Sequence, residues 1–216
     1  SGLVGSEMCI RDRDHTPPAV AITSFATDSG TSGDYRTNDT TPTISGSAEK
    51  GATVVLSQNG VVVATMTANS SSGNWSYTIP SSGALADGVY SYTATATDAA
   101  GNTTTTSPFA ITVDHTAPTI SITGFVDDTG AIGDRITKDN IPTISGVAEA
   151  GSAITIYQDG TSKGTTVAAG DGTWSFTLPS TVSDGLYSYT ATATDVAGNT
   201  SSATSAYTIT CLLYTS

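Results

Sequence analysis

The side chains with the clearest chemical potential in this sequence are carboxylates. The chain carries sixteen Asp and three Glu against two His, and four of the Asp fall in the single stretch 127–139. Ca²⁺ binds about 6–8 oxygen ligands, and short Asp, Asn and carbonyl groups on loops suit it. Asp also favours turns for local backbone reasons, but four carboxylates in one stretch exceed what a turn requires. The composition therefore favours a divalent-cation site.

Catalytic chemistry has little support in the sequence. Both histidines, His15 and His115, occupy an Asp-His-Thr slot, and no nucleophile repeats beside them as a catalytic triad would need. There is no Cys/His cluster for zinc and no Gly-rich loop leading into a helix for phosphate. The paired carboxylates of a glycosidase need a cleft within one domain. We therefore expect a protein that is not an enzyme.

The elements that position the carboxylates come in two copies. Asp14-His-Thr-Pro-Pro18 recurs as Asp114-His-Thr-Ala-Pro118, and the segment from Asp87 to Asp98 returns nearly unchanged from Asp184 to Asp195. Two copies of about 100 residues match the usual size of an immunoglobulin-like sandwich.

Within each copy, apolar and polar residues alternate with a period of two, which is typical of strands with one buried face. Asn59-Gly60 and Asp159-Gly160 predict tight hairpin turns with positive φ. Trp75 and Trp174 could stack on sugars, but they alternate with Ser in their strands, which predicts a place in the core. In the second copy we expect strands near 118–124, 142–148, 152–158, 163–168, 173–178, 186–194 and 205–210. The predicted fold class is all-β, with two tandem immunoglobulin-like Greek-key β-sandwiches of about seven strands each.

The two ends of the chain are predicted to be translated from a short DNA element that does not belong to the native gene. A codon choice for Cys211-Leu-Leu-Tyr-Thr-Ser216 has a reverse complement that encodes Glu7-Met-Cys-Ile-Arg-Asp12, so both ends fit opposite strands of one short element. This element resembles the transposon end that tags fragments in sequencing libraries; the other interpretation is a genuine apolar last strand. The expected organisation is 1–13 extraneous, 14–113 repeat 1, 114–210 repeat 2 and 211–216 extraneous. Both cysteines lie in the extraneous ends, so we expect no disulfide and no thiol chemistry in the native segment.

Several ordered motifs occur in both copies. They are Asp-x-Thr-x-Pro, Pro-Thr-Ile-Ser-Gly-x-Ala-Glu, Gly-x-Trp-Ser, Asp-Gly and Ala-Thr-Asp-x-Ala-Gly-Asn. In this order they resemble the bacterial Ig-like repeats of large secreted surface adhesins, of the biofilm-associated and RTX-type group. The resemblance covers Asp14 to Thr210. It implies tandem β-sandwiches that form a stalk outside the cell, with Ca²⁺ stiffening the junctions, and a role in cell adhesion and biofilm formation.

Strand parity predicts which end of a sandwich each loop occupies. Loops after the first and fifth strands lie where the chain leaves, and the loop after the sixth lies where it begins. We therefore expect a junction Ca²⁺ site that draws on Asp28, Asp34, Asp87, Asp114, Asp195 and Asn199. Two outer sites would each need a further neighbouring repeat. The full set of predicted metal ligands is Asp28, Asp34, Asp87, Asp98, Asn102, Asp114, Asp127, Asp128, Asp134, Asp184, Asp195 and Asn199.

The negative net charge makes some classes of binding partner unfavourable. Seven Lys plus Arg against 19 Asp plus Glu give a formal net charge of −12, which disfavours nucleic acid and anionic membranes. No apolar run approaches the roughly 18–20 residues of a membrane span. We expect a monomeric, extracellular fragment of the bacterial cell surface, whose partners are neighbouring Ig-like repeats and a distal adhesive domain with its host or surface ligand. Two alternatives stay open: a glycan- or protein-binding Ig-like module, which an exposed aromatic cluster would favour, and an accessory domain of a large secreted enzyme.

Overall fold

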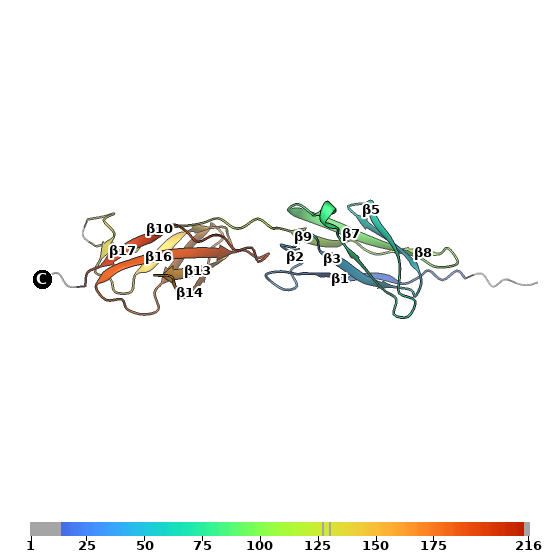
Figure 1. Ribbon diagram of the computed structural model, residues 1–216, viewed down its shortest axis with the longest axis horizontal. Coiled ribbons are helices and arrows are strands. Elements are labelled where there is room, and N and C mark those ends of the chain that lie inside the picture. Colours follow the sequence, from blue (N-terminus) through green and yellow to red (C-terminus); the bar gives the residue numbers. More distant parts are fainter. Residues whose placement is uncertain (1–13, 127, 130, 214–216) are drawn as a thin grey trace, which may run out of the picture. The chain divides into compact units, whose positions relative to one another are not determined.

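The computed structural model describes residues 14–126, 128–129 and 131–213, and they form two β-sandwich repeats (Figure 1). The helical content of these residues is one short 3-10 turn, η1 (Ser81–Gly83). Within this part of the chain, no helix has the length and apolar character that crossing a bilayer requires.

Repeat 1 consists of two sheets. The smaller sheet has the order β1-β3-β6, and the larger has the order β2-β9-β7-β4-β5, with β8 pairing to β7. The strand bounds are β1 (Val20–Ala26), β2 (Arg36–Thr37), β3 (Thr43–Ala48), β4 (Thr53–Gln58), β5 (Val61–Thr67), β6 (Asn74–Thr78), β7 (Gly88–Thr97), β8 (Thr103–Thr105) and β9 (Phe109–Val113).

Repeat 2 has the same organisation. Its smaller sheet has the order β10-β12-β15, and its larger sheet has the order β11-β17-β16-β13-β14. The strand bounds are β10 (Ile120–Phe125), β11 (Ile136–Thr137), β12 (Thr143–Ala148), β13 (Ala153–Gln158), β14 (Thr161–Val167), β15 (Thr173–Thr177), β16 (Gly185–Thr194) and β17 (Tyr207–Cys211). The seven expected strands are confirmed, and the short β11 is an addition that the alternation did not predict.

The core of each repeat is built from the alternating apolar face of both sheets. In repeat 2, Ile144 and Trp174 come from the smaller sheet, and Ile154, Tyr189 and Ile209 come from the larger one. All five are buried, and the intervening Ser and Thr residues face outward. The period-two pattern therefore identified the buried face correctly, because successive side chains of a strand point to opposite sides of the sheet.

Each tryptophan ring lies close to a glycine of the neighbouring strand. Trp75 pairs with Gly46 in the β3–β6 ladder, and a Cβ atom on Gly46 would come within 2.3 Å of the Trp75 ring. Trp174 and Gly146 repeat this arrangement in repeat 2. The core position expected for both tryptophans is confirmed, since Trp75 is 5% exposed and Trp174 is 4% exposed.

The predicted tight turns are present where the sequence places them. Asn59 and Gly60 have φ of 50° and 81°, and Asp159 and Gly160 have φ of 51° and 79°. Two successive positive φ values are the mark of a type I′ turn, whose twist matches that of the flanking strands. These turns fix the register of β4 with β5 and of β13 with β14.

A short parallel pairing closes the larger sheet of each repeat. β2 pairs with β9 through Arg36–Thr112 and Thr37–Val113, and the backbone N–H of Asp114 donates to the Thr37 oxygen at 2.8 Å. In repeat 2, β11 pairs in parallel with β17, where the Leu212 N–H donates to the Thr137 oxygen at 2.8 Å.

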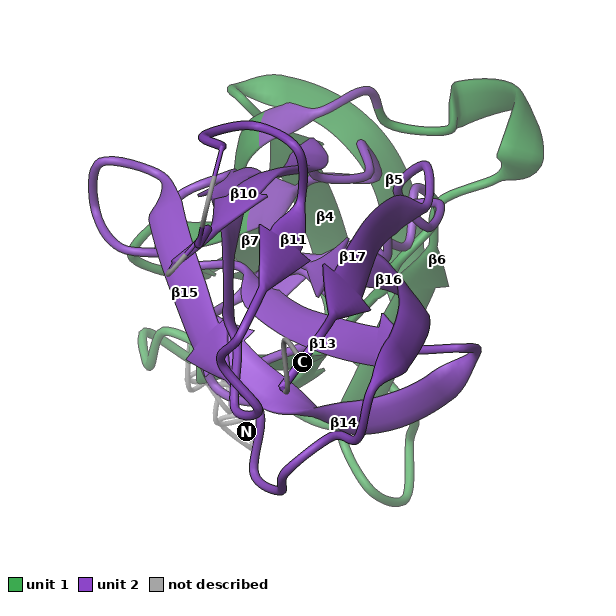
Figure 2. Cartoon of the chain, turned by 90° about the vertical axis from the view of Figure 1, so that its left-hand side faces the viewer, with its two compact units in different colours: residues 1–27, 41–85, 89–111 green, residues 28–40, 86–88, 112–216 purple. Residues whose placement is uncertain are grey.

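The compact units of the chain differ slightly from the repeats (Figure 2). Among the described residues, unit 1 comprises 14–27, 41–85 and 89–111, and unit 2 comprises 28–40, 86–88 and 112–213. Unit 2 therefore includes the loop 28–40 and the turn at Asp87, although both lie in repeat 1 by sequence.

The C-terminal end of repeat 2 reaches beyond the expected boundary at residue 210. Cys211, which the codon pattern assigns to the extraneous end, is the last residue of β17 and is fully buried. It occupies the place that Val113 holds at the end of β9. The extraneous segment 1–13 and residues 214–216 lie outside the described residues.

Candidate functional site

The best-defined polar cluster of unit 2 is the hairpin 195–199 that follows β16. Oδ1 of Asp195 accepts the Asn199 backbone N–H at 2.9 Å, and Oδ2 accepts the Asn199 side-chain amide at 2.8 Å. Gly198 supplies the positive φ of 89° that this tight turn requires. As a result, the Asp195 carboxylate is held in one orientation and is only 7% exposed.

The same hairpin binds the segment that leads into β10. The Asn199 side-chain amide donates to the backbone oxygen of Asp114 at 2.8 Å. The side-chain oxygen Oδ1 of Asp114 accepts the backbone N–H of Thr116 at 3.2 Å, which is the hydrogen bond of an Asx turn. The structure therefore brings together Asp114, Asp195 and Asn199, three of the six residues expected at the junction site.

Unit 1 contains a second copy of this arrangement. Asp98 accepts the side-chain amide of Asn102 at 2.7 Å, and that amide also donates to the backbone oxygens of Asp14 and Thr16 at 3.2 and 3.3 Å. The hydrogen bond from the Asn102 side chain holds the pKa of Asp98 below its ordinary value. The predicted ligands Asp98 and Asn102 are thus adjacent, next to the start of the first repeat.

Glu149 belongs to the electrostatic surroundings of the unit 2 hairpin and was missed by the sequence reasoning. Desolvation raises its pKa above the ordinary value, and the negative charges of Asp195 and Asp114 raise it further. A sequence signal was present, because Glu49 and Glu149 both close the Pro-Thr-Ile-Ser-Gly-x-Ala-Glu motif in a chain with only three Glu.

Asp87 binds the connecting segment rather than facing the hairpin carboxylates. Its Oδ1 accepts the His115 backbone N–H at 2.9 Å and pairs with the His115 ring, and its Oδ2 accepts the Thr116 hydroxyl. The Thr116 and His115 hydrogen bonds hold the pKa of Asp87 below its ordinary value. At the equivalent place, Asp184 accepts the Leu213 N–H at 2.7 Å.

Asp28 and Asp128 each have one carboxylate oxygen that accepts no hydrogen bond from the described residues. In Asp28 and Asp128, Oδ2 accepts the N–H of the glycine five residues later, at 2.5 and 2.6 Å. The other oxygen, Oδ1, is buried without a hydrogen-bond partner in both residues. Asp34 and Asp134 cap the following turns, accepting the N–H groups of Arg36 and Ile136 at 2.9 Å.

Some of these oxygens are of the chemical kind that binds a hard divalent cation. A buried carboxylate oxygen without a donor is costly, and a cation is one partner that would satisfy it. Asp28 and Asp128 each offer such an oxygen in their own loops, and Asp114, Asp195 and Glu149 carry carboxylates of the kind that Ca²⁺ prefers. Within residues 14–126, 128–129 and 131–213, however, no three His, Cys, Asp or Glu converge as ligands of one ion. The predicted ligand Asp127 lies outside the described residues.

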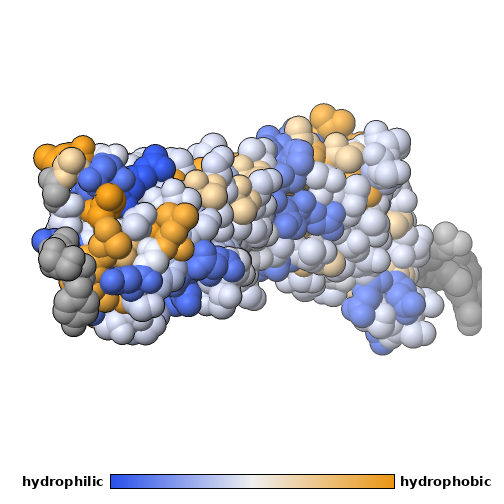
Figure 3. Space-filling view, turned by 60° about the vertical axis from the view of Figure 1, so that its left-hand side comes forward, coloured by the Kyte–Doolittle hydropathy of each residue, from blue (hydrophilic) through white to orange (hydrophobic). Residues whose placement is uncertain are grey.

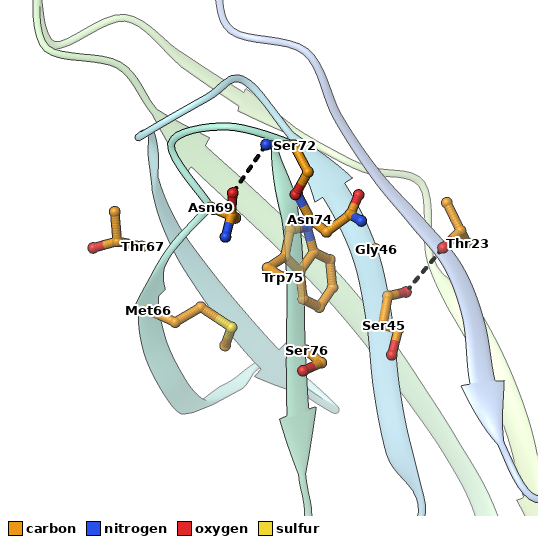
Figure 4. A pocket seen from close by; sticks show the side chains of 10 residues that line it. All are labelled: Thr23, Ser45, Gly46, Met66, Thr67, Asn69, Ser72, Asn74, Trp75 and Ser76. Carbon is orange, nitrogen blue, oxygen red and sulfur yellow. Dashed lines mark hydrogen bonds between the residues drawn. The ribbon is translucent and has the colours of Figure 1, made fainter.

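A groove on unit 1 is the other candidate for ligand binding (Figure 4). It runs past β5 and β6 and is lined by uncharged groups that include Met66, Asn69, Ser72 and Asn74. Trp75 lies at its base, but the ring is buried against Gly46 and leaves little face for a sugar to stack on.

Twelve large hydrophobic side chains are exposed among the described residues. In the face seen in Figure 3, the apolar side chains gather mainly toward the left-hand end and lie next to hydrophilic ones. Ile132 and Leu186 of unit 2 are the most exposed, at 96% and 69%. Among the described residues, Tyr35 is the one aromatic among the exposed large hydrophobic side chains. The aromatic cluster that would favour a glycan- or protein-binding module is therefore not seen in this part of the chain.

Comparison with solved structures finds similarity to parts of an adhesin, of a large adhesion protein and of a biofilm-associated protein. A structure from work on host cell surface retention of a 1.5-MDa bacterial ice-binding adhesin is 23% identical, with a TM-score of 0.47, and the match covers 92% of this chain and 65% of that one. A tetra-tandem repeat from the extending region of a large adhesion protein is 25% identical, with a TM-score of 0.36 and coverage of 89% and 50%. The BSP domain of a biofilm-associated protein is 24% identical, with a TM-score of 0.32 and coverage of 92% and 30%.

Comparison with curated proteins gives no match. The family model of the bacterial Ig-like domain matches twice, over residues 15–115 and 116–211, so the matches coincide closely with the two repeats. Together they cover most of the chain, and they end at the last residue of β17. The chain therefore belongs to the bacterial Ig-like domain family, of which it contains two tandem copies.

Proposed function

We propose that this chain is a spacer segment from the stalk of a secreted bacterial cell-surface adhesin. In this proposal, Ca²⁺ binds beside the hairpins that follow β7 and β16 and restricts the motion of the connecting segments. The protein supports cell adhesion and biofilm formation by extending a distal adhesive domain away from the cell, and it performs no catalysis itself.

The observation that carries the proposal is the link from Asn199 to Asp114. One amide joins the connecting segment to the Asp195 hairpin, with the negative charges of Asp195, Asp114 and Glu149 close enough to raise the Glu149 pKa. A cation there would relieve this repulsion and would couple the connecting segment to the hairpin. Motion between adjacent domains is the default when their interface is small, so such coupling would change how far the chain extends.

The proposed ligands divide by role. Asp195 and Asp114 would supply carboxylate oxygens, Asn199 would keep them oriented, and Glu149 would add negative charge. The unpaired Oδ1 of Asp28 would supply a further oxygen from the loop 28–40 of the same unit. Asp87 would act differently, because its two oxygens already hold His115 and Thr116.

The test is a comparison of the full chain in excess EDTA and in millimolar Ca²⁺, by differential scanning calorimetry and small-angle X-ray scattering. We expect Ca²⁺ to raise Tm and to lengthen the distribution of interatomic distances. A ligand at 100 times its Kd stabilises a protein by about 2.7 kcal/mol, so the rise in Tm should be easily measured.

Two variants make the test specific. Asp195→Asn should abolish most of the Ca²⁺-dependent rise in Tm because it removes a central ligand charge. Asp159→Asn is the matched control: it also removes one negative charge, but Asn59 already fills the equivalent turn in repeat 1 with the same hydrogen bond to the next strand. A full chain that shows no response to Ca²⁺ would refute the proposal and would make the binding-module alternative the next to test.

A further inference from the structure

The stretch 51–85 of repeat 1 contains no charged residue, although the whole chain has a formal net charge of −12. It includes the strands β4, β5 and β6, which come from both sheets of the repeat. The equivalent stretch of repeat 2 contains Asp159, Lys163 and Asp171. Repeat 1 therefore has a charge-free region that repeat 2 lacks.

β5 is an edge strand within this charge-free region. It is the last strand in the order β2-β9-β7-β4-β5, so one side pairs with β4 and the other side pairs with no strand of the described residues (Figure 1). An unpaired edge presents backbone N–H and C=O groups that can bind another strand. Val61 and Val62, at the start of β5, are 68% and 59% exposed. β5 thus combines an open backbone edge with exposed apolar side chains.

The equivalent edge of repeat 2 is protected. At the start of β14, Thr161-Ser-Lys163 replaces the three valines of β5. A lysine on an edge strand opposes pairing with another strand, because the pairing would bring its charge out of water. Both strands have the same β-bulge, since the register shifts after Leu56 in one repeat and after Ile156 in the other. The side chains, and not the bulge, therefore distinguish the two edges.

We infer that β5 is a self-association site, at which two copies of this chain pair their β5 strands antiparallel about a two-fold axis. In a two-fold arrangement the same surface serves both partners, so a single edge strand is sufficient. Antiparallel pairing gives each unpaired N–H and C=O group of one β5 a partner on the other.

The charge distribution favours an identical chain as the partner. Two chains of net charge −12 repel each other wherever their carboxylates meet, and the charge-free region 51–85 is where they can approach with the least repulsion. A cationic partner would gain nothing from a charge-free edge and would be drawn to the carboxylate hairpins.

The expected dimer is weak and reversible. Pairing along one strand of seven residues buries less than the roughly 1,200 Å² at which stable interfaces begin. Such a dimer would join neighbouring chains side by side, at a surface that contains none of the predicted metal ligands. The inference goes beyond the proposed function because it needs no cation.

The test is sedimentation equilibrium of the full chain in EDTA, from micromolar to millimolar concentration. We expect the mean mass to rise from that of one chain toward that of two, and to return on dilution. Hydrogen exchange of the β5 amides should slow at the higher concentration, because the outward N–H groups gain acceptors in the partner strand.

Two substitutions locate the association. Val62→Lys should abolish the rise in mass, because it places a charge on the β5 edge, next to the position that Lys163 holds in β14. Val167→Lys is the matched control: it places the same charge on the edge strand of repeat 2, in place of a valine that is 62% exposed against 59% for Val62. The control should associate as the unsubstituted chain does. Both side chains are exposed, so neither variant disturbs a core.

The outcomes separate this inference from the proposed function. A chain that stays monomeric at millimolar concentration would overturn the inference, as would association that Val62→Lys does not weaken or that Val167→Lys weakens equally. A mass that exceeds two chains or does not return on dilution would also overturn it, because two-fold pairing stops at a dimer. A reversible dimer in EDTA from a chain whose Tm does not respond to Ca²⁺ would support self-association and refute the calcium proposal alone.

Discussion

The side-chain nitrogen of Asn199 lies 2.8 Å from the backbone oxygen of Asp114. It lies at the same distance from Oδ2 of Asp195, so one amide group joins the segment that leads into β10 to the hairpin after β16. The corresponding amide of Asn102 makes longer contacts with the connecting segment, 3.2 Å to Asp14 and 3.3 Å to Thr16. The equivalent asparagine therefore makes a shorter hydrogen bond to the connecting segment in repeat 2 than in repeat 1.

This difference predicts unequal effects of the same substitution. Asn199→Ala should lower the free energy of unfolding of unit 2 by about 1–2 kcal/mol, because the nearly buried Asp195 carboxylate loses a donor. For a domain of about 100 residues, each kcal/mol lowers Tm by about 4–8 °C. Calorimetry of the full chain in EDTA measures this change. Asn102→Ala is the matched comparison and should cost less; an equal or larger cost would contradict the assignment.

The carboxylates around Glu149 predict a measurable change in its pKa. Asp195→Asn removes one of the two negative charges that raise the pKa, so the Glu149 pKa should fall toward its ordinary value. An NMR titration of the Glu149 side chain measures this shift. Asp159→Asn should leave the Glu149 pKa where it is; a fall of the same size in that control would mean that the Asp195 charge is not a local cause.

The raised pKa of Glu149 also determines whether the free energy of unfolding rises or falls with pH. A folded state that binds its Glu149 proton more tightly than the unfolded chain loses stability as pH rises from the ordinary Glu value through the raised value. Asp195→Asn should weaken this pH dependence, and urea unfolding across that pH range would show it.

The hydrogen bond from Thr116 to Asp87 lowers the Asp87 pKa, so removing it should change that pKa in the upward direction. Thr116→Val should raise the pKa of Asp87 toward its ordinary value, because the hydroxyl is the largest cause of the lowering. Asp87 with a depressed pKa contributes stability that is present above the unfolded-state pKa and is lost as pH falls through the folded-state pKa. An NMR titration of Asp87 in both proteins is the measurement. Thr16→Val changes the equivalent threonine in repeat 1 and should leave the Asp87 titration unchanged.

Substitutions at two glycines of the loop 28–40 distinguish the cost of backbone strain from the cost of a steric clash with the hairpin. Gly30 and Gly33 both have positive φ, at 71° and 88°, so alanine at either position incurs strain of about 1–2 kcal/mol. Only at Gly30 does the added Cβ meet the hairpin 195–199. Gly30→Ala should therefore destabilise the protein more than Gly33→Ala, and it should also speed hydrogen exchange of the Thr31 amide. Equal exchange rates in the two variants would show that the loop does not contact the hairpin in solution.

The strands and turns were predictable because they follow from local rules. Alternation in Trp174-Ser-Phe176 records which side chains face the core, and Asn59-Gly60 supplies the two positive φ values that a type I′ turn needs. Strand parity also placed the hairpin 195–199 at the N-terminal end of repeat 2, where Asn199 bonds to Asp114 and Asp195; the role of these residues as metal ligands stays a prediction.

The features that the sequence did not predict depend on which distant segments of the backbone come close together, and no local residue pattern encodes this. Asp87 was expected among the metal ligands, yet its oxygens are used by His115 and Thr116, which depends on how the connecting segment folds back. The contact of Gly30 with Val196 joins residues far apart in sequence, and glycine at position 30 alone reads as a turn. The short β2 and β11 are two residues long and carry too few side chains for a period to emerge.

The parallel pairing of β2 with β9 has a mechanical consequence. A pulling force applied to the two ends of a repeat enters near β1 and leaves through β9, so it slides β9 along β2 rather than peeling it away. The Thr112–Tyr35 and Asp114–Thr37 backbone bonds, at 2.9 and 2.8 Å, then carry the load side by side and must break together. The Thr210–Arg135 and Leu212–Thr137 bonds repeat this in β17 at 2.9 and 2.8 Å. Under such a pull, these bonds would hold each repeat at a place distinct from the carboxylate hairpins.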